Sequence, residues 1–169
     1  MSLQKLMTNY AAYNLWANQS LVEWLRTKPA ELFKAEVPSS FSSILKTFNH
    51  ILAVQEFWYS VVNESELKTN RYGATEMQLE EVIADLIAQS NALGAYVNTL
   101  SEKELEKKVH LDTPWVKGEM PRYEFLQHVF NHSTYHRGQI ITIGRNIGLT
   151  DAPMTDYNFF NMAVEKSVA

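Results

Sequence analysis

Apolar residues recur every three or four positions along most of the chain, which is the period of one face of an α-helix. The first such stretch covers residues 3–26 and carries the polar Asn14 on its apolar face. A break follows near Pro29, and residues 38–40 offer a helix start for a second stretch, residues 41–62. Because this second stretch is apolar around most of its circumference, we expect it to be a central helix.

The next two segments predict a third helix followed by a loop. The helix begins at a capping box formed by Thr75 and Gln78 and keeps the helical period until the next polar segment. That segment, residues 101–120, is interrupted by proline and glycine. It therefore predicts a loop with at most a short turn or a brief strand at residues 109–111.

A fourth helix and a short terminal one complete the pattern. Pro121 suits the first position of a helix, and the helical period continues until Gly148, a typical residue just past a helix end. After Pro153, the tail is compatible with a short helix beginning near Thr155 or Asp156. Four long helices without an alternating strand pattern predict an all-α four-helix bundle with a short C-terminal helix.

Length, charge and composition exclude several classes of protein. The 169 residues fit one domain, covering positions 1–169. The chain has 15 Lys and Arg against 19 Asp and Glu, a net charge of −4, and no clustered basic stretch, so nucleic acid is not an expected partner. Because cysteine is absent, the chain has no disulfide, no thiolate metal site and no cysteine nucleophile.

Hydropathy also argues against export and membrane insertion. The N-terminal residues lack the uninterrupted apolar region of a signal peptide. No window approaches the eighteen or more apolar residues of a membrane span. We therefore expect a cytoplasmic protein without a membrane partner.

The histidines are the strongest chemical signal. His128, His132 and His136 are spaced four residues apart on the fourth predicted helix, so neighbouring members can reach a common point, but the helical rise keeps all three from meeting. His50 is the only histidine on a different long helix, in a largely apolar segment. An unpaired imidazole there costs free energy, whereas a metal ion would satisfy it. His50, His132 and His136 are thus candidate ligands of one divalent ion.

Three neutral imidazoles suit Zn²⁺, Ni²⁺, Cu²⁺ or Fe²⁺ and leave at least one coordination position open, as in catalytic zinc sites. The competing interpretation is that each histidine is a hydrogen-bonded core residue or an exposed one, and spacing alone does not decide between them. We expect His110 to be exposed in a loop. His128 is either a hydrogen-bond partner of a ligand or polar surface one turn from the site.

Two familiar metal chemistries are excluded by missing residues. His132 is followed by Ser133, so the HExxH motif of zinc proteases is absent, and no glutamate has a histidine three residues later, as di-iron bundles require. A mononuclear site without a neighbouring carboxylate remains. This favours a Lewis-acid role, either activating water or lowering the pKa of a coordinated thiol.

Residues 131–140, Asn-His-Ser-Thr-Tyr-His-Arg-Gly-Gln-Ile, closely resemble the signature of the DinB family. Residues 13–18 and 48–52 look like its first two helices, and residues 153–156, Pro-Met-Thr-Asp, resemble its C-terminal segment. The resemblance implies an up-down-down-up four-helix bundle, usually a homodimer. It further implies that nickel, zinc or a similar ion binds the triad, here His50, His132 and His136.

The same resemblance directs attention to residues around the triad. Many family members have a histidine at the position of Tyr135, a difference that bears on pocket polarity. Arg137 points about 100° around the helix from the neighbouring ligand, which favours a buried ion pair or a helix contact over anion binding. Asn14, Tyr13 and Trp58 either line a cavity above the metal or belong to the core, and the rule that buried polar groups are paired favours a core hydrogen bond for Asn14.

Three functions follow from these observations. The first is a metal-dependent enzyme acting on a small molecule, with transfer of a thiol cofactor to an electrophile as its chemistry, because relatives of this kind include thiol S-transferases, alongside a maleylpyruvate isomerase. A metallohydrolase is the alternative on the same site. The second is a non-catalytic, stress-related protein that binds metal or a ligand, and the third is a helical bundle without a metal. The sequence identifies no catalytic residue.

Overall fold

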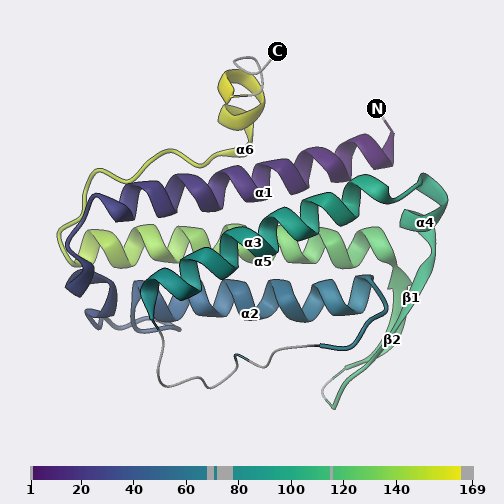
Figure 1. Cartoon of the computed structure of the whole chain (residues 1–169), viewed down its shortest axis with the longest axis horizontal. Helices are drawn as coiled ribbons and strands as arrows, with labels where there is room; N and C mark the ends of the chain where they lie inside the picture. Colours follow the sequence, from purple (N-terminus) through teal and green to yellow (C-terminus); the bar gives the residue numbers. More distant parts are fainter. Residues whose placement is uncertain (1, 68–70, 72–77, 115, 165–169) are drawn as a thin grey trace.

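A computed structural model of the chain describes residues 2–67, 71, 78–114 and 116–164. Its four long helices are α1 (Leu3–Arg26), α2 (Ile44–Val62), α3 (Leu79–Thr99) and α5 (Arg122–Asn146). Helix α1 packs against α3 and α5, and α2 packs against the same two, so α1 and α2 lie diagonally opposite each other. Figure 1 shows α1 and α5 running in one direction and α2 and α3 in the other. The predicted four-helix bundle of up-down-down-up type is confirmed.

The start of α2 differs from the prediction. Ser43 has an extended backbone, and its side chain accepts a hydrogen bond from the backbone N–H of Lys46, so the helix begins at Ile44. This cap satisfies one of the free N–H groups of the first turn. Phe41, which the sequence pattern placed inside the helix, therefore lies in the segment before it.

The ends of α3 and α5 follow from local chemistry. Gln78 occupies the position before α3, whereas Thr75 of the predicted capping box lies outside the described residues. Gly148 adopts φ +92°, and the N–H of Leu149 donates to the carbonyl of Gly144 at 2.8 Å. This is the left-handed turn that glycine favours just past a helix end, so the predicted stop of the fourth helix is confirmed.

Residues 101–121 contain more structure than the predicted loop. A capping box at Ser101 starts the short helix α4 (Glu102–Glu106), and strands β1 (Lys108–Asp112) and β2 (Lys117–Pro121) form an antiparallel hairpin. Strand β1 alternates between exposed and buried residues, and His110 is exposed on it. All but the last residue of β2 is exposed, so this strand has no apolar pattern from which to predict it.

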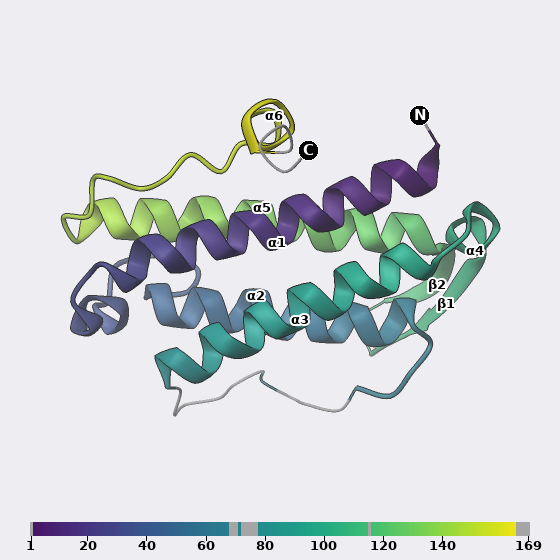
Figure 2. The ribbon, with the colours of Figure 1, turned by 45° about the horizontal axis from the view of Figure 1, so that its top comes forward.

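Shorter helices follow α1 and α5. A 3₁₀ helix, η1 (Ala30–Lys34), follows α1 and buries Phe33, a feature the sequence pattern does not predict. Helix α6 (Tyr157–Phe159) continues into a π-helical turn, η2 (Phe160–Val164), which confirms the expected short C-terminal helix. Figure 2 shows α6 outside the bundle near α1, where Tyr157 stacks on Tyr10 with ring centroids 4.6 Å apart.

Two large apolar clusters fill the bundle, and a third, small one joins Tyr13 and Ala17 of α1 to Phe160. The cluster at the C-terminal end of α1 includes Leu21, Leu25, Phe48, Ile51, Ile83, Leu86 and Ile140. The cluster at the N-terminal end of α1 includes Met7, Val62, Leu93, Val97, Phe125 and Val129. Among the described residues, no helix is both long and apolar enough to cross a membrane.

Candidate metal centre

Three histidines from two neighbouring helices converge on one point. His50 comes from α2, and His132 and His136 come from adjacent turns of α5; one nitrogen of each ring lies within 4.8 Å of the other two. The Nε2 atoms of His50 and His132 are 3.0 Å apart. Nitrogens bound at about 2.0–2.1 Å to one tetrahedral ion would be roughly 3.3 Å apart, so this spacing fits a shared ion. The group could therefore hold a metal.

Gln139 sets the orientation of His136. Its Oε1 atom lies 2.7 Å from Nδ1 of His136, one turn earlier on the same helix. Because an amide oxygen can only accept, the proton resides on Nδ1 and the lone pair of Nε2 is left for a metal. Nε2 of Gln139 in turn donates to the hydroxyl of Tyr135 at 3.2 Å. Gln139, three residues after His136, thus orients a candidate ligand, a role that sequence reasoning did not assign.

Phe41 forms one wall of the site. Its ring stacks on His50, with centroids 4.0 Å apart and planes 23° from parallel, and meets His136 edge-on at 5.5 Å. Sequence reasoning missed Phe41 because it placed the residue within the second helix. The signal that would have found it is Ser43, an equally favourable helix cap that leaves Phe41 outside.

Burial keeps the three rings neutral. Loss of solvent lowers the pKa of His50 from its ordinary 6.5 to about 4, and repulsion from His136 adds to the effect. The pKa of His132 falls to about 4 for the same reasons, burial first and neighbouring histidines next. Burial also lowers the pKa of His136, although the bond to Gln139 opposes it. At neutral pH all three rings are therefore in the form that binds metal.

These shifts predict the pH dependence of the metal-free protein. In the unfolded chain a histidine has a pKa of about 6.5, so between about pH 6.5 and 4 the unfolded state binds more protons than the folded state. The stability contributed by the neutral rings is present above pH 6.5 and is lost as the pH falls towards 4. We expect the thermal midpoint of chelator-treated protein to fall across this window.

A double variant, His50→Gln with His132→Gln, isolates this contribution. Carboxylates whose pKa is lowered by partners, such as Glu64 with Lys107, destabilise both proteins equally in acid. The midpoint of the variant should therefore decline less steeply between pH 6.5 and 4. Parallel curves for the two proteins would show that the rings do not titrate as described.

The residues flanking the triad make specific contacts. His128 is exposed; its ring lies 5.6 Å from that of His132 and 4.9 Å from that of Trp58, and it is not part of the converging group. Trp58 also stacks on Phe125 at 5.5 Å. Tyr135 is 63 % exposed, with its ring 4.9 Å from that of His136. Tyr135 thus borders the triad directly, whereas the histidine contact of Trp58 is with His128, outside the triad.

Arg137 of α5 is buried against Asn14 and Tyr13 of α1. Arg137 is 1 % exposed, and its Nη1 donates to Oδ1 of Asn14 at 2.8 Å and to Oδ1 of Asn18 at 3.1 Å. The guanidinium carbon lies 5.3 Å from the ring centre of Tyr13, whose hydroxyl donates to the Thr155 carbonyl. No carboxylate of the described residues pairs with Arg137, so its role here is the helix contact rather than the ion pair.

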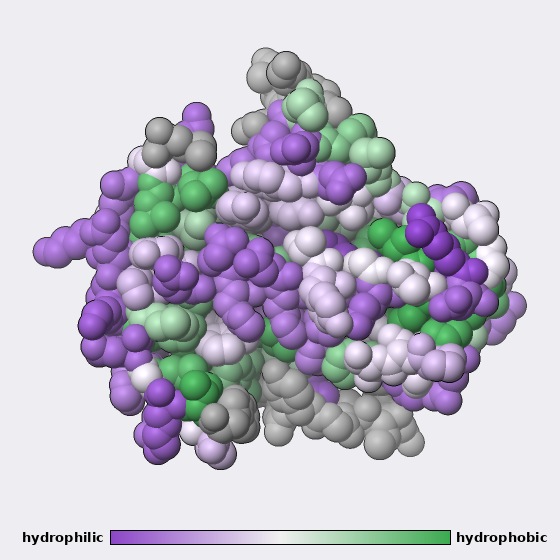
Figure 3. Space-filling model, turned by 180° about the vertical axis from the view of Figure 1, so that it is seen from behind, coloured by the Kyte–Doolittle hydropathy of each residue, from purple (hydrophilic) through white to green (hydrophobic). Residues whose placement is uncertain are grey.

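An uncharged groove adjoins the triad. It encloses about 540 Å³ between the segment before α2 and the exposed side of α5, and it shares Tyr135 and Gln139 with the surroundings of His136. Its other polar lining groups, Ser39, Ser40, Thr142 and Asn146, are all uncharged. The face in Figure 3 is mainly hydrophilic, with its hydrophobic areas separated from one another. A ligand in this groove would be recognised through hydroxyl and amide groups.

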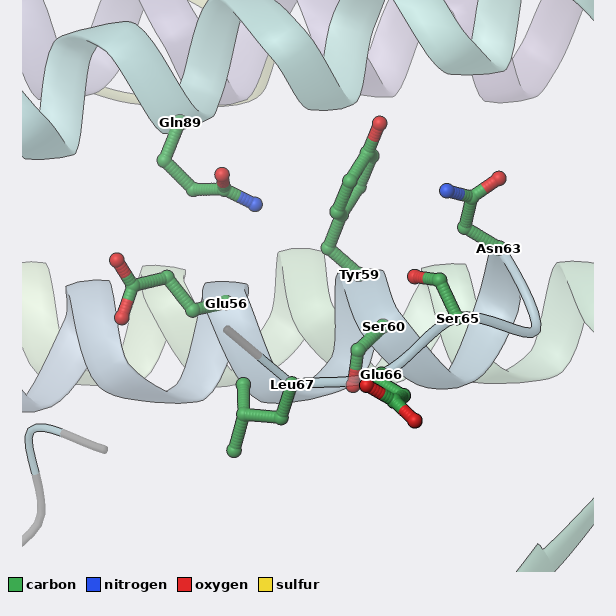
Figure 4. Close-up of a pocket in the computed structure, with 8 residues that line it drawn as sticks. All are labelled: Glu56, Tyr59, Ser60, Asn63, Ser65, Glu66, Leu67 and Gln89. Atoms are coloured by element: carbon green, nitrogen blue, oxygen red, sulfur yellow. The ribbon is translucent and has the colours of Figure 1, made fainter. Parts of the chain in front are cut away.

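A second cavity is unrelated to the histidines. It encloses about 410 Å³ between α2 and α3. Figure 4 shows Glu56 and Tyr59 on α2 and Gln89 on α3, with their side chains extending between the two helices. No histidine lines it. Glu56 pairs with Nε of Arg71 at 3.1 Å, so its charge is engaged within the fold. Among the described residues, the metal-ligating side chains that come together are those of the triad.

Comparison with known proteins gives a consistent result. The model of the DinB family matches residues 1–167. Protein DinB of Bacillus subtilis (strain 168) is 33 % identical over 156 residues, which cover 88 % of this chain and 89 % of that protein. A crystal structure of a DinB-like protein from Bacillus cereus ATCC 10987 has a TM-score of 0.67 at 21 % identity, covering 85 % of this chain and 91 % of that one. Another, from Bacillus subtilis, has a TM-score of 0.65 at 19 % identity, covering 87 % and 97 %. These two structures show a shared fold.

Proposed function

The chain belongs to the DinB family, and from this premise we propose that it is a metal-dependent enzyme that transfers a low-molecular-weight thiol to an electrophilic small molecule. The observation that carries the proposal is the convergence of three neutral imidazoles from two helices within 4.8 Å. Such a set leaves room for a further ligand, as catalytic sites do. Nickel or zinc is the ion that we expect there, because both accept imidazole ligands.

Each side chain has a separate task in this proposal. His50, His132 and His136 would hold the ion, and Gln139 keeps the proton of His136 on Nδ1. A bound divalent ion supplies Lewis acidity, which lowers the pKa of a coordinated thiol or water. The ring of Phe41 covers one side of His50 and excludes water from it.

The surroundings favour a thiol over water as the activated group. No carboxylate of the described residues joins the three histidines, so no acidic side chain stands beside them as a general base. A thiol, with a free pKa near 8.5, needs far less help to ionise than water does. The uncharged groove beside Tyr135 and Gln139 suits a substrate rich in hydroxyl or amide groups. A homodimer in the cytoplasm is the setting that we propose.

The test begins with protein purified without an affinity tag, in which metal is measured by elemental analysis. The metal-loaded protein is then incubated with a low-molecular-weight thiol and a chloroarene electrophile, and loss of free thiol is followed. Faster loss than with chelated protein supports the proposal. Ester hydrolysis without thiol transfer would instead indicate the metallohydrolase, and bound metal without turnover the non-catalytic binding protein. Absence of metal under replete conditions would leave a structural bundle.

A further inference from the structure

A layer of buried polar residues separates the two apolar clusters of the bundle. Every long helix contributes to it, and each member is at most 1 % exposed: Asn14 and Asn18 from α1, Gln55 from α2, Ser90 from α3 and Arg137 from α5. On each helix these positions fall between the residues of one cluster and those of the other. The layer therefore crosses the bundle at one level.

Hydrogen bonds connect the layer across the core. Nδ2 of Asn14 donates to Oε1 of Gln55 at 3.0 Å, and Oδ1 of Asn14 accepts from Nη1 of Arg137 at 2.8 Å. Asn18 bonds to the hydroxyl of Ser90 at 3.0 Å and also accepts from Arg137 at 3.1 Å. Asn14 thus joins α2 to α5, although it belongs to the helix diagonally opposite α2.

Filling a core with these polar groups costs free energy. Arg137 places a charge among neutral partners, and its Nε, together with Nε2 of Gln55, makes no hydrogen bond with the described part of the chain. Apolar side chains of similar volume often stabilise a protein as much as buried charged groups or more. The polar layer adds specificity for one arrangement of the helices. Apolar packing tolerates several arrangements, whereas hydrogen bonds in a low dielectric specify one.

Both histidine-bearing helices are tied to the layer close to their ligands. Gln55 lies five residues after His50 on α2, and Arg137 directly follows His136 on α5. Sliding one helix by a turn, about 5.4 Å, would bury the layer against apolar residues. Metal ligands tolerate displacements of only about 0.5 Å. If hydrogen bonds in the layer fix the register of α2 against α5, they therefore also fix the separation of His50 from His132.

We propose that Asn14, Gln55 and Arg137 are positioning residues of the metal centre, which set the relative register of α2 and α5 and hence the convergence of the three imidazoles. The inference rests on the proposed function, since it concerns the same site. It assigns to Asn14, which contacts none of the three histidines in the hydrogen-bond network, a role in metal affinity.

The experiment separates metal affinity from stability. In the triple variant Asn14→Leu, Gln55→Leu, Arg137→Met, the thermal midpoint of the metal-free protein should be nearly unchanged, because apolar burial offsets the lost hydrogen bonds, including the one that Asn18 accepts from Arg137. Zn²⁺ affinity, measured by calorimetry, should fall roughly tenfold or more, as it does when groups that orient ligands are removed. The visible absorption spectrum of the Co²⁺-loaded variant should change, because it reports ligand geometry.

A pair of single variants keeps the proposal testable if the triple variant does not fold. Asn14→Ala removes both bonds that join α2 to α5 and should lower Zn²⁺ affinity. Asn14→Asp still accepts from Arg137, and the amide of Gln55 can rotate so that Nε2 donates to the new carboxylate; affinity and Co²⁺ spectrum should recover. Val97→Ala, in the apolar cluster away from the layer, should lower stability and leave affinity unchanged.

Unchanged affinity and an unchanged Co²⁺ spectrum in Asn14→Ala would overturn the inference. So would a loss of affinity in Val97→Ala equal to that in Asn14→Ala, since destabilisation alone would then explain both. If the unaltered protein binds neither Zn²⁺ nor Co²⁺, the proposed function itself fails. The two failures are therefore distinguished by the unaltered protein alone.

Discussion

Replacing His132 by alanine is expected to lower Zn²⁺ affinity by a factor of roughly a hundred or more. Structural zinc sites with four ligands contribute roughly 10–16 kcal/mol, or about 3 kcal/mol for each ligand, and about 3 kcal/mol corresponds to somewhat more than a hundredfold. His132 lies close to both other histidines, with its Nε2 3.0 Å from that of His50 and its ring centroid 4.4 Å from that of His136. Calorimetric titration of the chelated protein measures the loss directly.

The matched control is His128→Ala. His128 precedes His132 by one turn on the same helix, and its ring also lies close to that of His132, yet its nitrogens are outside the converging group. This variant should retain Zn²⁺ affinity within about tenfold, the range expected for a neighbour that does not coordinate. Equal losses in the two variants would mean that the ligand set is not His50, His132 and His136.

Helical periodicity was sufficient to predict the bundle and to bring the histidines together in principle. The period places side chains on a face of each helix, so the four-residue spacing of His132 and His136 predicts that they share a face. The position of His50 in an apolar segment then marks it as a ligand that needs a partner. These inferences use only residues on one helix at a time, which is the information that a pattern holds.

The pattern did not predict which residues of other helices contact each face. Asn14 was identifiable as a polar residue on an apolar face, but its partners Gln55 and Arg137 are 41 and 123 positions away and follow only from the packing of the helices. Phe41 was missed because the serines before it, at residues 39–40, and Ser43 after it both offered a helix cap. Strand β2 was missed because a strand that is exposed on both faces has no hydrophobic alternation.

Replacing Arg122 by alanine is expected to lower the free energy of unfolding by about 3 kcal/mol. The buried guanidinium has three acceptors: Nε donates to the carbonyl of Val62 at the end of α2, Nη1 to that of Glu104 in α4, and Nη2 to the carboxylate of Glu64, at 2.8, 2.8 and 2.6 Å. Its removal leaves the Glu104 carbonyl without this donor and opens space in the core. The thermal midpoint should fall by roughly 6–12 °C for a chain of this length.

Lys107→Ala provides the comparison, because Lys107 pairs with the same carboxylate of Glu64 at 2.7 Å but has a side chain 55 % exposed. An exposed pair is worth about 1 kcal/mol or less, so this variant should lose less than about 3 °C. Arg122→Lys keeps the charge but cannot reach three acceptors with one ammonium group, and its midpoint should lie between the other two. If Arg122→Ala were no less stable than Lys107→Ala, the guanidinium would contribute only its surface ion pair, and burial between α2, α4 and α5 would add nothing to the fold.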